Sequence, residues 1–180
     1  MRLVFIDVEL SGIQAFDQVV DFSAIENGKT LRNSLVGCPE RISEETMNLT
    51  GLNMNDFSEA SPNIEETFDI LFEDIAVASY GLQYDLNWIN HTLRMYGKKE
   101  LQSMKGICLR ELHTHITRHW VNLDDALKYF YPRYDPEIHR PVHRSMRDAI
   151  LHYKLYQKMT AHLQEFSLTD SVKEFIPGEI

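Results

Sequence analysis

This sequence has only two cysteines and no long apolar run. The two cysteines, Cys38 and Cys108, lie far apart and lack the spacing of metal ligands, which indicates buried or free thiols in a reducing compartment. No apolar stretch approaches the ~20 residues that a membrane-spanning helix needs. Only four apolar residues run up to Asp7, too few for a signal peptide. We therefore expect a cytoplasmic protein that has no membrane partner.

Basic residues are also scarce. The 18 lysines and arginines are outnumbered by 27 aspartates and glutamates, so the net charge is −9. Such an excess of acid disfavours a nucleic-acid partner. The charges are unevenly distributed, however, because residues 1–97 carry 5 basic and 16 acidic side chains, whereas residues 98–158 carry 12 basic and 7 acidic ones. A basic region in an acidic protein can still contact phosphates, and ordinary surface solvation explains the same asymmetry equally well.

The apolar pattern predicts one α/β domain with a mixed sheet covered by helices. With 180 residues, the chain is long enough for a single domain with a full core. Three antiparallel strands are expected first, and Asn27-Gly28 is typical of the two-residue turn of a hairpin. The predicted strands cover residues 3–9, 15–26, 30–36 and 75–79. In the second strand, one face is expected to consist of Phe16, Val20, Phe22 and Ala24.

Apolar stripes at helical spacing predict four helices. They cover residues 64–72, 84–97, 123–130 and 145–163. The stripe of the first predicted helix consists of Ile64, Phe68, Leu71 and Phe72. Three prolines interrupt residues 131–142, which we therefore expect to form a loop.

Two acids interrupt the first predicted strand, in the stretch FIDVEL at residues 5–10. Residues two apart in a strand project from the same face, so Asp7 and Glu9 are expected to lie close together. Neighbouring carboxylates repel each other, and a divalent metal ion resolves that conflict because hard cations prefer oxygen ligands. A strand with one wet face is the alternative, but the apolar residues on both sides of Asp7 leave no clearly polar face.

Two further acids and a histidine occupy unusual positions. Asp85 lies at the start of a predicted helix and in line with its apolar stripe, and Asp148 stands at the top of a second such stripe. Stabilisation by the helix dipole is the alternative for Asp85, but it does not explain the inward face. His143 follows Pro141 and is expected on a mobile loop, from which it can reach the site that Asp148 helps to form.

The order of these residues resembles that of the DEDDh, or DnaQ-like, 3′–5′ exonucleases. DVELSG is similar to the family's first motif, Asp-x-Glu-Thr-Thr-Gly. YDLNWI is similar to the second motif, built around Phe-Asp, and HRSMRDA is similar to the third, His-x-Ala-x-x-Asp-Ala. Tyr80 and Gly81 stand where many members have His-Asn, and the segment around Cys108 lacks the usual Asp-Thr. Arg144 replaces the tyrosine of the tyrosine subtype, so the histidine subtype fits better.

The resemblance implies a ribonuclease H-like fold. This is an α/β fold in which a mixed five-stranded sheet, with three antiparallel strands first and parallel additions afterwards, is flanked by helices. Residues 1–180 would form a single exonuclease domain. Its motifs would lie in residues 1–160, and residues 161–180 would form a helical C-terminal extension.

The same resemblance implies a mechanism with two metal ions, either Mg²⁺ or Mn²⁺. Asp7 would contact both ions, Glu9 and Asp148 would complete the first site, and Asp85 would support the second through water. Such an ion pair clamps the attacking and leaving oxygens of an in-line displacement. His143 would act as the general base on the attacking water.

Substrate contacts are also implied by the resemblance. The implied substrate-binding residues are Leu10, Ser11, Gly12, Tyr80 and Arg144. The first three would hold the last nucleotide through backbone amides and an apolar contact. The arginines near the third motif are candidates for phosphate contacts, although solvation of a helix end explains each of them equally well. They are Arg133, Arg140, Arg144 and Arg147.

These expectations favour a metal-dependent 3′–5′ exonuclease that releases 5′-mononucleotides from the 3′ end of a nucleic acid, with single-stranded DNA as the favoured substrate. An exoribonuclease of the oligoribonuclease or RNase T-like kind is the near alternative. A non-catalytic nucleic-acid-binding module of the same fold is a third hypothesis. A polymerase or repair partner, a monomer and a homodimer are all compatible with the resemblance.

Overall fold

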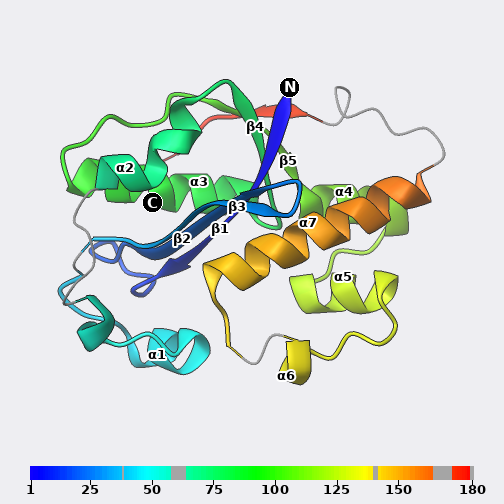
Figure 1. The fold of residues 1–180 in the computed structure, drawn as a ribbon, viewed down its shortest axis with the longest axis horizontal. Coiled ribbons are helices and arrows are strands. Elements are labelled where there is room, and N and C mark those ends of the chain that lie inside the picture. The colour runs from blue at the N-terminus through cyan, green and yellow to red at the C-terminus, as the bar shows by residue number, and fades with distance from the viewer. Residues whose placement is uncertain (38, 58–63, 140–141, 164–171, 179–180) are drawn as a thin grey trace.

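In the computed structural model, a mixed sheet lies between two layers of helices (Figure 1). The structure describes residues 1–37, 39–57, 64–139, 142–163 and 172–178. Within these residues the sheet has six strands, in the order β3-β2-β1-β4-β5-β6. The strands are β1 (Arg2–Leu10), β2 (Val19–Glu26), β3 (Lys29–Leu35), β4 (Ile75–Ser79), β5 (Met104–Cys108) and β6 (Lys173–Phe175). The helices are α1 (Glu44–Thr50), α2 (Ile64–Phe68), α3 (Leu82–Met95), α4 (Leu109–Thr117), α5 (Leu123–Phe130), α6 (Pro136–His139) and α7 (Ser145–His162), with 3₁₀ turns η1 (Met54–Phe57) and η2 (Asp69–Phe72).

The strand directions match the prediction. β1, β2 and β3 are antiparallel neighbours, β4 pairs in parallel with β1, and β5 pairs in parallel with β4. Asn27 and Gly28 join β2 to β3 with φ angles of 51° and 75°. Both angles lie in the left-handed region that asparagine and glycine tolerate, which is the geometry of the predicted two-residue turn. The predicted α/β class with a mixed sheet is therefore confirmed.

The sheet has one strand more than the predicted five. β6 pairs antiparallel with β5 and places Phe175 opposite Met104, where both side chains are buried. The prediction of a helical extension over residues 161–180 is therefore wrong at residues 173–175, and α7 ends at His162. The edge of β5 presents backbone groups that need partners, and a three-residue strand satisfies them although it is too short to leave a recognisable pattern.

β1 is covered on both faces, which explains its almost entirely apolar sequence. Its alternate residues facing the α3 layer are Val4, Ile6 and Val8. Phe5 faces α7 instead, where its ring centroid lies 5.3 Å from that of Tyr153 and 5.2 Å from that of Tyr156. Asp7 and Glu9 share the phase of Phe5, because side chains alternate along a strand. Both acids are therefore on the α7 face.

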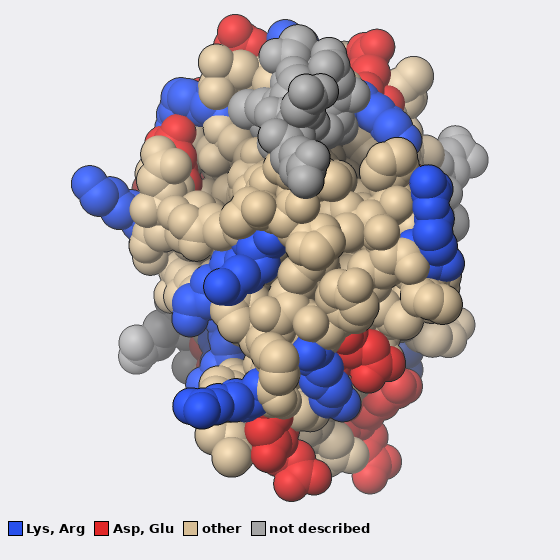
Figure 2. Space-filling model, turned by 90° about the vertical axis from the view of Figure 1, so that its right-hand side faces the viewer, with Lys and Arg blue, Asp and Glu red and all other residues tan. Residues whose placement is uncertain are grey.

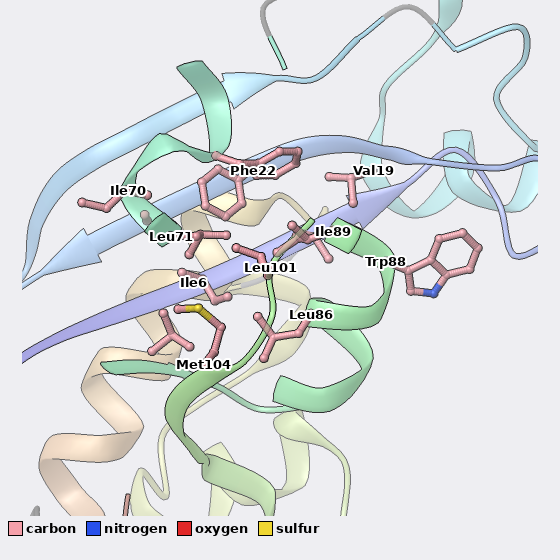
Figure 3. Close-up of a cluster of buried hydrophobic side chains, with 14 of the residues drawn as sticks. Ile6, Val19, Phe22, Ile70, Leu71, Leu86, Trp88, Ile89, Leu101 and Met104 are labelled. Atoms are coloured by element: carbon pink, nitrogen blue, oxygen red, sulfur yellow. The ribbon is translucent and has the colours of Figure 1, made fainter. Parts of the chain in front are cut away.

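The core between the sheet and α3 contains the apolar stripe that the sequence predicts. The buried residues of this stripe are Leu86, Ile89 and Leu93, each at most 1% exposed. Figure 3 shows Leu86 and Ile89 in one cluster with Ile6 of β1 and Phe22 of β2. The Phe22 ring meets the ring of Phe68 in α2 edge-on, at a centroid distance of 5.0 Å. This packing fixes the orientation of α3 and of the acid in its first turn.

Two predicted core residues are exposed. Phe16 is 60% exposed because β2 begins only after it. The Asp17 carboxylate accepts a hydrogen bond from the backbone N–H of Gln14 at 2.7 Å and closes a turn there. Phe72 is 42% exposed because it ends the 3₁₀ turn η2, whose tighter winding carries the side chain away from the apolar stripe.

Several elements were not predicted from the sequence. They are α1, β5, α4 and the short α6, which lies within the expected loop of residues 131–142. β5 contains Gly106 in place of a branched residue. A Cβ atom at this glycine would lie 2.7 Å from the carbonyl oxygen of Val77 in β4, so the close approach of the two strands requires glycine there. Such a strand lacks the residues by which strands are recognised.

α7 crosses the sheet on the face opposite α3, against β1 and β2 (Figure 1). Its predicted apolar stripe of Leu151, Leu155 and Met159 is buried, as expected. Neither α7 nor any other helix in the described part of the chain combines the length and the apolar character that crossing a bilayer requires. The stripe instead holds α7 on the sheet.

Candidate active site

The acids of β1 face the N-terminal half of α7. The strand and the helix run in opposite directions, so Phe5 meets the second half of the helix and the acids meet the first half. Asp7 Oδ1 lies 3.8 Å from His152 Nε2, and Glu9 lies beside Asp148. The side chain of Asp7 is 14% exposed, and Asp148 is 2% exposed. These carboxylates are therefore largely withdrawn from water.

Asp21 of β2 holds the N-terminus of α7 next to these acids. Its Oδ2 accepts hydrogen bonds from Arg144 Nε at 2.8 Å and from the backbone N–H of Ser145 at 3.3 Å. Ser145 Oγ also lies 2.7 Å from Ser23 Oγ in β2. The N-cap residue of α7 makes no side-chain cap, so Asp21 stabilises the positive end of the helix from a neighbouring strand. β2 thereby sets the position of Asp148 in the first turn.

The histidine before α7 lies with two of the acids. One ligand atom each of Glu9, His143 and Asp148 lies within 4.8 Å of the other two. The backbone N–H of His143 donates a hydrogen bond to the carbonyl oxygen of Leu49, at 2.8 Å. The sequence predicts a mobile loop at this point, whereas the main chain of His143 is bonded to the end of α1.

Asp85 lies on the inward face of the first turn of α3, as predicted. Ser79, the last residue of β4, donates a hydrogen bond from its hydroxyl to Asp85 Oδ2. Burial raises the pKa of Asp85 from its ordinary value to about 7. The hydrogen bond from Ser79 and the positive charge of Arg110 oppose this rise, and the negative charge of Asp148 adds to it. Asp85 and Asp148 therefore belong to one electrostatic site.

His152 is part of the site, and sequence reasoning missed it. It is 1% exposed and follows Asp148 by one helical turn, on the same side of α7. Its Nδ1 lies 3.0 Å from the carbonyl oxygen of Ile6. Because a carbonyl oxygen only accepts, Nδ1 carries the proton and directs Nε2 toward Asp7. The four-residue spacing from Asp148 was the signal that could have identified it.

A pocket of about 600 Å³ opens beside Asp7 and Asp85. Its lining includes Tyr80, Arg110 and Trp120. Arg110 lies in the first turn of α4, and Trp120 follows that helix. Sequence reasoning missed both residues because it did not recognise β5 and α4, which carry the chain to this pocket.

The segment that follows β1 borders a second pocket, of about 380 Å³, which is lined by Glu9, Leu10 and Gly12 among others. Ser11 is only 1% exposed, and its N–H and hydroxyl both donate hydrogen bonds within the following turn. A Cβ atom at Gly12 would lie 2.5 Å from Oδ2 of the buried Asp17, so the turn itself requires glycine. Leu10 and Gly12 therefore reach open space, whereas the amide of Ser11 is used inside the protein.

Two other predicted substrate contacts are paired within the chain. The hydroxyl of Tyr80 donates a hydrogen bond to the carbonyl oxygen of Val121 at 2.9 Å, and burial raises its pKa. The Nε of Arg144 is bound to Asp21. Both side chains therefore hold the site in shape, and their predicted roles toward a substrate are untested.

The arginines near the third motif that the structure describes lie in different surroundings. Arg140 lies outside the described residues, and Arg147 stands in the first turn of α7. Arg133 lines a separate pocket of about 540 Å³ between α5 and α7, together with Lys154 and Lys158. Figure 2 shows the side of the molecule over the ends of α4, α5 and α7, where lysines and arginines are scattered around a broad uncharged area. A continuous basic track is not seen on this side.

The donor set suits a hard divalent cation. Glu9 of β1 and Asp148 of α7 lie beside the imidazole of His143, and Asp85 of α3 is close enough for the charge of Asp148 to raise its pKa. The positive charge of Arg110 does not offset the burial of Asp85, so ionisation of this carboxyl requires a further positive charge. A divalent cation supplies that charge and prefers oxygen ligands. The chain therefore has a candidate metal site, built from residues that the sequence predicts.

Comparison with known proteins places this geometry in context. No known family model matches the chain. The DNA polymerase III PolC-type of Ureaplasma parvum serovar 3 is 26% identical over an alignment 182 positions long, which covers 93% of this chain and 12% of the polymerase. This chain thus spans a small fraction of that relative's length.

Solved structures resemble the chain over most of its length. Exonuclease X in complex with 5′ overhanging duplex DNA is 17% identical, with a TM-score of 0.64 and coverage of 94% of this chain and 96% of that one. A 3′-exonuclease solved in the recognition of a histone mRNA stem-loop is 13% identical, with a TM-score of 0.71 and coverage of 89% and 81%. The chain therefore shares the fold of these solved exonucleases, and the predicted α/β fold is confirmed.

The raised pKa of Asp85 predicts how the stability of the metal-free protein depends on pH. The folded protein retains this proton up to about pH 7, whereas the unfolded chain releases it near pH ~4. The stability that the protonated carboxyl supports is therefore lost as the pH rises from about 4 to about 7. Asp85→Asn keeps a neutral group at every pH. In EDTA, we expect its melting temperature to exceed that of the wild type by a margin that widens from about pH 5 to about pH 8.

Thermal unfolding followed by circular dichroism measures this margin. We expect a difference in melting temperature of a few degrees at the higher pH, since each kcal/mol of stability shifts the melting temperature by ~2–4 °C. The matched control is Asp74→Asn, because the side chain of Asp74 is 94% exposed and should show a constant margin. A margin that does not change with pH for Asp85→Asn would contradict the prediction.

Proposed function

We propose that this chain is a metal-dependent 3′–5′ exonuclease that hydrolyses the terminal phosphodiester bond of single-stranded DNA and releases 5′-mononucleotides. The observation that supports this most directly is the approach of Glu9, His143 and Asp148 to within 4.8 Å. Asp7 and Asp85 line the adjoining pocket. An acidic site with two histidines, His143 and His152, in the fold of the 3′-exonucleases favours phosphodiester hydrolysis over the other hypotheses.

Each residue has a proposed part in the reaction. Asp7, Glu9, Asp85 and Asp148 would hold two divalent ions, Mg²⁺ or Mn²⁺, which when bound would stabilise the negative charge that develops on the phosphate. His143 accepts the proton of the attacking water as the general base. The carboxylates of Glu9 and Asp148 stabilise the imidazolium that results, and the bond to Leu49 holds the histidine main chain in place.

The preference for DNA over RNA rests on the relatives of the chain. The PolC-type relative is a DNA polymerase, which favours DNA, whereas the histone mRNA 3′-exonuclease of similar fold keeps an exoribonuclease as the alternative. A polymerase or repair partner is suggested by the same relative and stays a prediction. Oligomeric state and a cytoplasmic location also stay predictions.

A direct assay tests this proposal. Single-stranded DNA and RNA of the same sequence, labelled at the 5′ end, are incubated with the protein in Mg²⁺ or Mn²⁺. We expect a ladder that shortens one nucleotide at a time from the 3′ end, faster for DNA, with 5′-mononucleotides identified by chromatography. Addition of EDTA should stop the reaction.

Asp148→Asn, purified in parallel, excludes a contaminating nuclease, and Asp74→Asn is the matched control for loss of an exposed acid. No shortening of either strand would overturn the proposal. Binding without shortening would support the non-catalytic module, and faster loss of RNA would support the exoribonuclease.

A further inference from the structure

The pocket beside Asp7 and Asp85 contains a cation–aromatic stack to which the proposed chemistry assigns no role. The guanidinium carbon of Arg110 lies 4.9 Å from the centroid of the Trp120 ring and 5.2 Å from that of Tyr80. The three side chains line the same pocket as the two acids. A planar cation and an exposed aromatic ring thus stand next to the reaction site.

Arg110 is not neutralised by a carboxylate in contact with it. Within the described residues its Nε is buried without a hydrogen-bond partner, and its guanidinium forms no ion pair with them. Its charge reaches Asp85, whose pKa it lowers. A guanidinium with donors to spare, inside a pocket lined by acids, suits a ligand that brings its own negative charge, and phosphate matches its forked donors.

Trp120 presents its ring to solvent at the rim of the same pocket. It is 69% exposed, in contrast to Trp88, the other tryptophan of the chain, which is 2% exposed in the core. An exposed indole beside a guanidinium is a suitable platform for an unpaired base, because every base has a π-face and arginine adds a cation–π contribution. A base within a duplex is already stacked on both faces and cannot use this ring.

The stack is built where the chain departs from the family motifs. Tyr80 replaces the usual histidine, and Cys108 stands in the segment that lacks Asp-Thr. The thiol of Cys108 lies 3.7 Å from the carbonyl oxygen of Tyr80. The hydroxyl of Tyr80 also binds the carbonyl oxygen of Val121, the residue after Trp120. Tyr80 therefore contacts Arg110 through its ring and the backbone next to Trp120 through its hydroxyl.

We infer that Arg110 and Trp120 form a nucleotide subsite, in which Arg110 binds a phosphate and Trp120 stacks on an unpaired base of the same strand. The ligand class is single-stranded nucleic acid, DNA or RNA, because both share the phosphate and the π-face of the base. This inference deepens the proposed function and rests on it. It adds a contact that selects an unpaired strand next to the metal site.

Binding without cleavage tests the subsite. The full chain is titrated in EDTA with single-stranded DNA, single-stranded RNA and a blunt DNA duplex, and the tryptophan fluorescence and anisotropy of a labelled strand are recorded. We expect quenching by either single strand. Trp120→Ala should abolish the quenching and weaken single-strand binding about 5- to 150-fold, the range that the loss of one stacked base predicts. Duplex binding should change little.

Arg110→Gln should weaken binding of both single strands and reduce the slope of log K against log salt by about 0.7, the value for one phosphate contact on a single strand. Arg110→Lys keeps the charge but not the forked donors, so it should keep the wild-type salt slope and recover only part of the affinity. Trp120→Phe keeps a ring and should retain most of the affinity. The matched control is the exposed pair Lys99 and Phe72, whose Nζ-to-centroid distance is 5.4 Å and which lines a different pocket. Lys99→Gln and Phe72→Ala should bind as the wild type does.

The outcomes separate this inference from the proposed function. If the wild type neither shortens nor binds either strand, the proposed function fails. If the wild type shortens a strand while folded Trp120→Ala and Arg110→Gln bind and cleave as well as it does, only the subsite is overturned. A loss confined to one of the two variants also overturns it, since the subsite requires the ring and the cation together.

Discussion

Asp7→Asn is expected to slow the release of 3′ nucleotides by about a thousandfold or more, because the lost charge belongs to one of the four carboxylates that would hold the metal ions. Each ~1.4 kcal/mol of lost stabilisation is a factor of ten in rate. Asparagine has nearly the same shape, so β1 and its packing should persist. The measurement is the single-turnover rate on labelled single-stranded DNA in saturating Mn²⁺. Circular dichroism confirms that the variant is folded.

The control for this variant is Asp74→Asn, an exposed acid outside the pocket, which should cleave at the wild-type rate. In EDTA the Asp7→Asn protein should melt no lower than the wild type, because one of several neighbouring carboxylates has been neutralised. A cleavage rate within tenfold of the wild type would contradict the proposed role of Asp7.

His143→Ala is expected to lower the cleavage rate by about 10²–10⁴-fold, the usual contribution of a general base, while leaving Mn²⁺ affinity close to that of the wild type. Its main-chain bond to Leu49 does not depend on the imidazole, so the segment before α7 should stay in place. Asp148→Asn, in contrast, should lose both activity and metal affinity. Single-turnover rates and calorimetric titration with Mn²⁺ separate the two roles.

This comparison is needed because His143 lies as close to Glu9 and Asp148 as a metal ligand would. If His143→Ala loses Mn²⁺ affinity to the same degree as Asp148→Asn, the histidine is a ligand and its proposed role as a base is wrong. His115→Ala removes an exposed histidine on α4 and should change neither quantity.

Much of the scaffold of the site could be predicted because it follows from local patterns. The alternation in β1 indicated that Asp7 and Glu9 share a face, and the stripes of α3 and α7 indicated that Asp85 and Asp148 point inward. These patterns involve residues at most a few positions apart. They therefore survive in the sequence whatever the rest of the fold does.

The remainder depends on contacts between distant segments. His152 enters the site through a bond to Ile6, and Trp120 does so because Tyr80 holds the carbonyl oxygen of the next residue. The four-residue spacing from Asp148 indicates which side of α7 His152 lies on, but the two long-range bonds themselves cannot be read from the sequence. β5 escaped recognition for a similar reason, since its glycine is required by the neighbouring strand and weakens the strand pattern.

The two-sided packing of β1 makes the placement of its acids an all-or-none matter. If the strand shifted its register by one residue, its carboxylates would be buried in the hydrophobic core under α3, and Ile6 and Val8 would face the candidate metal site. Desolvating two charges in this way is far too costly to persist. Formation of the hydrophobic core therefore also places the carboxylates of β1 on the face of the sheet that carries the candidate metal site.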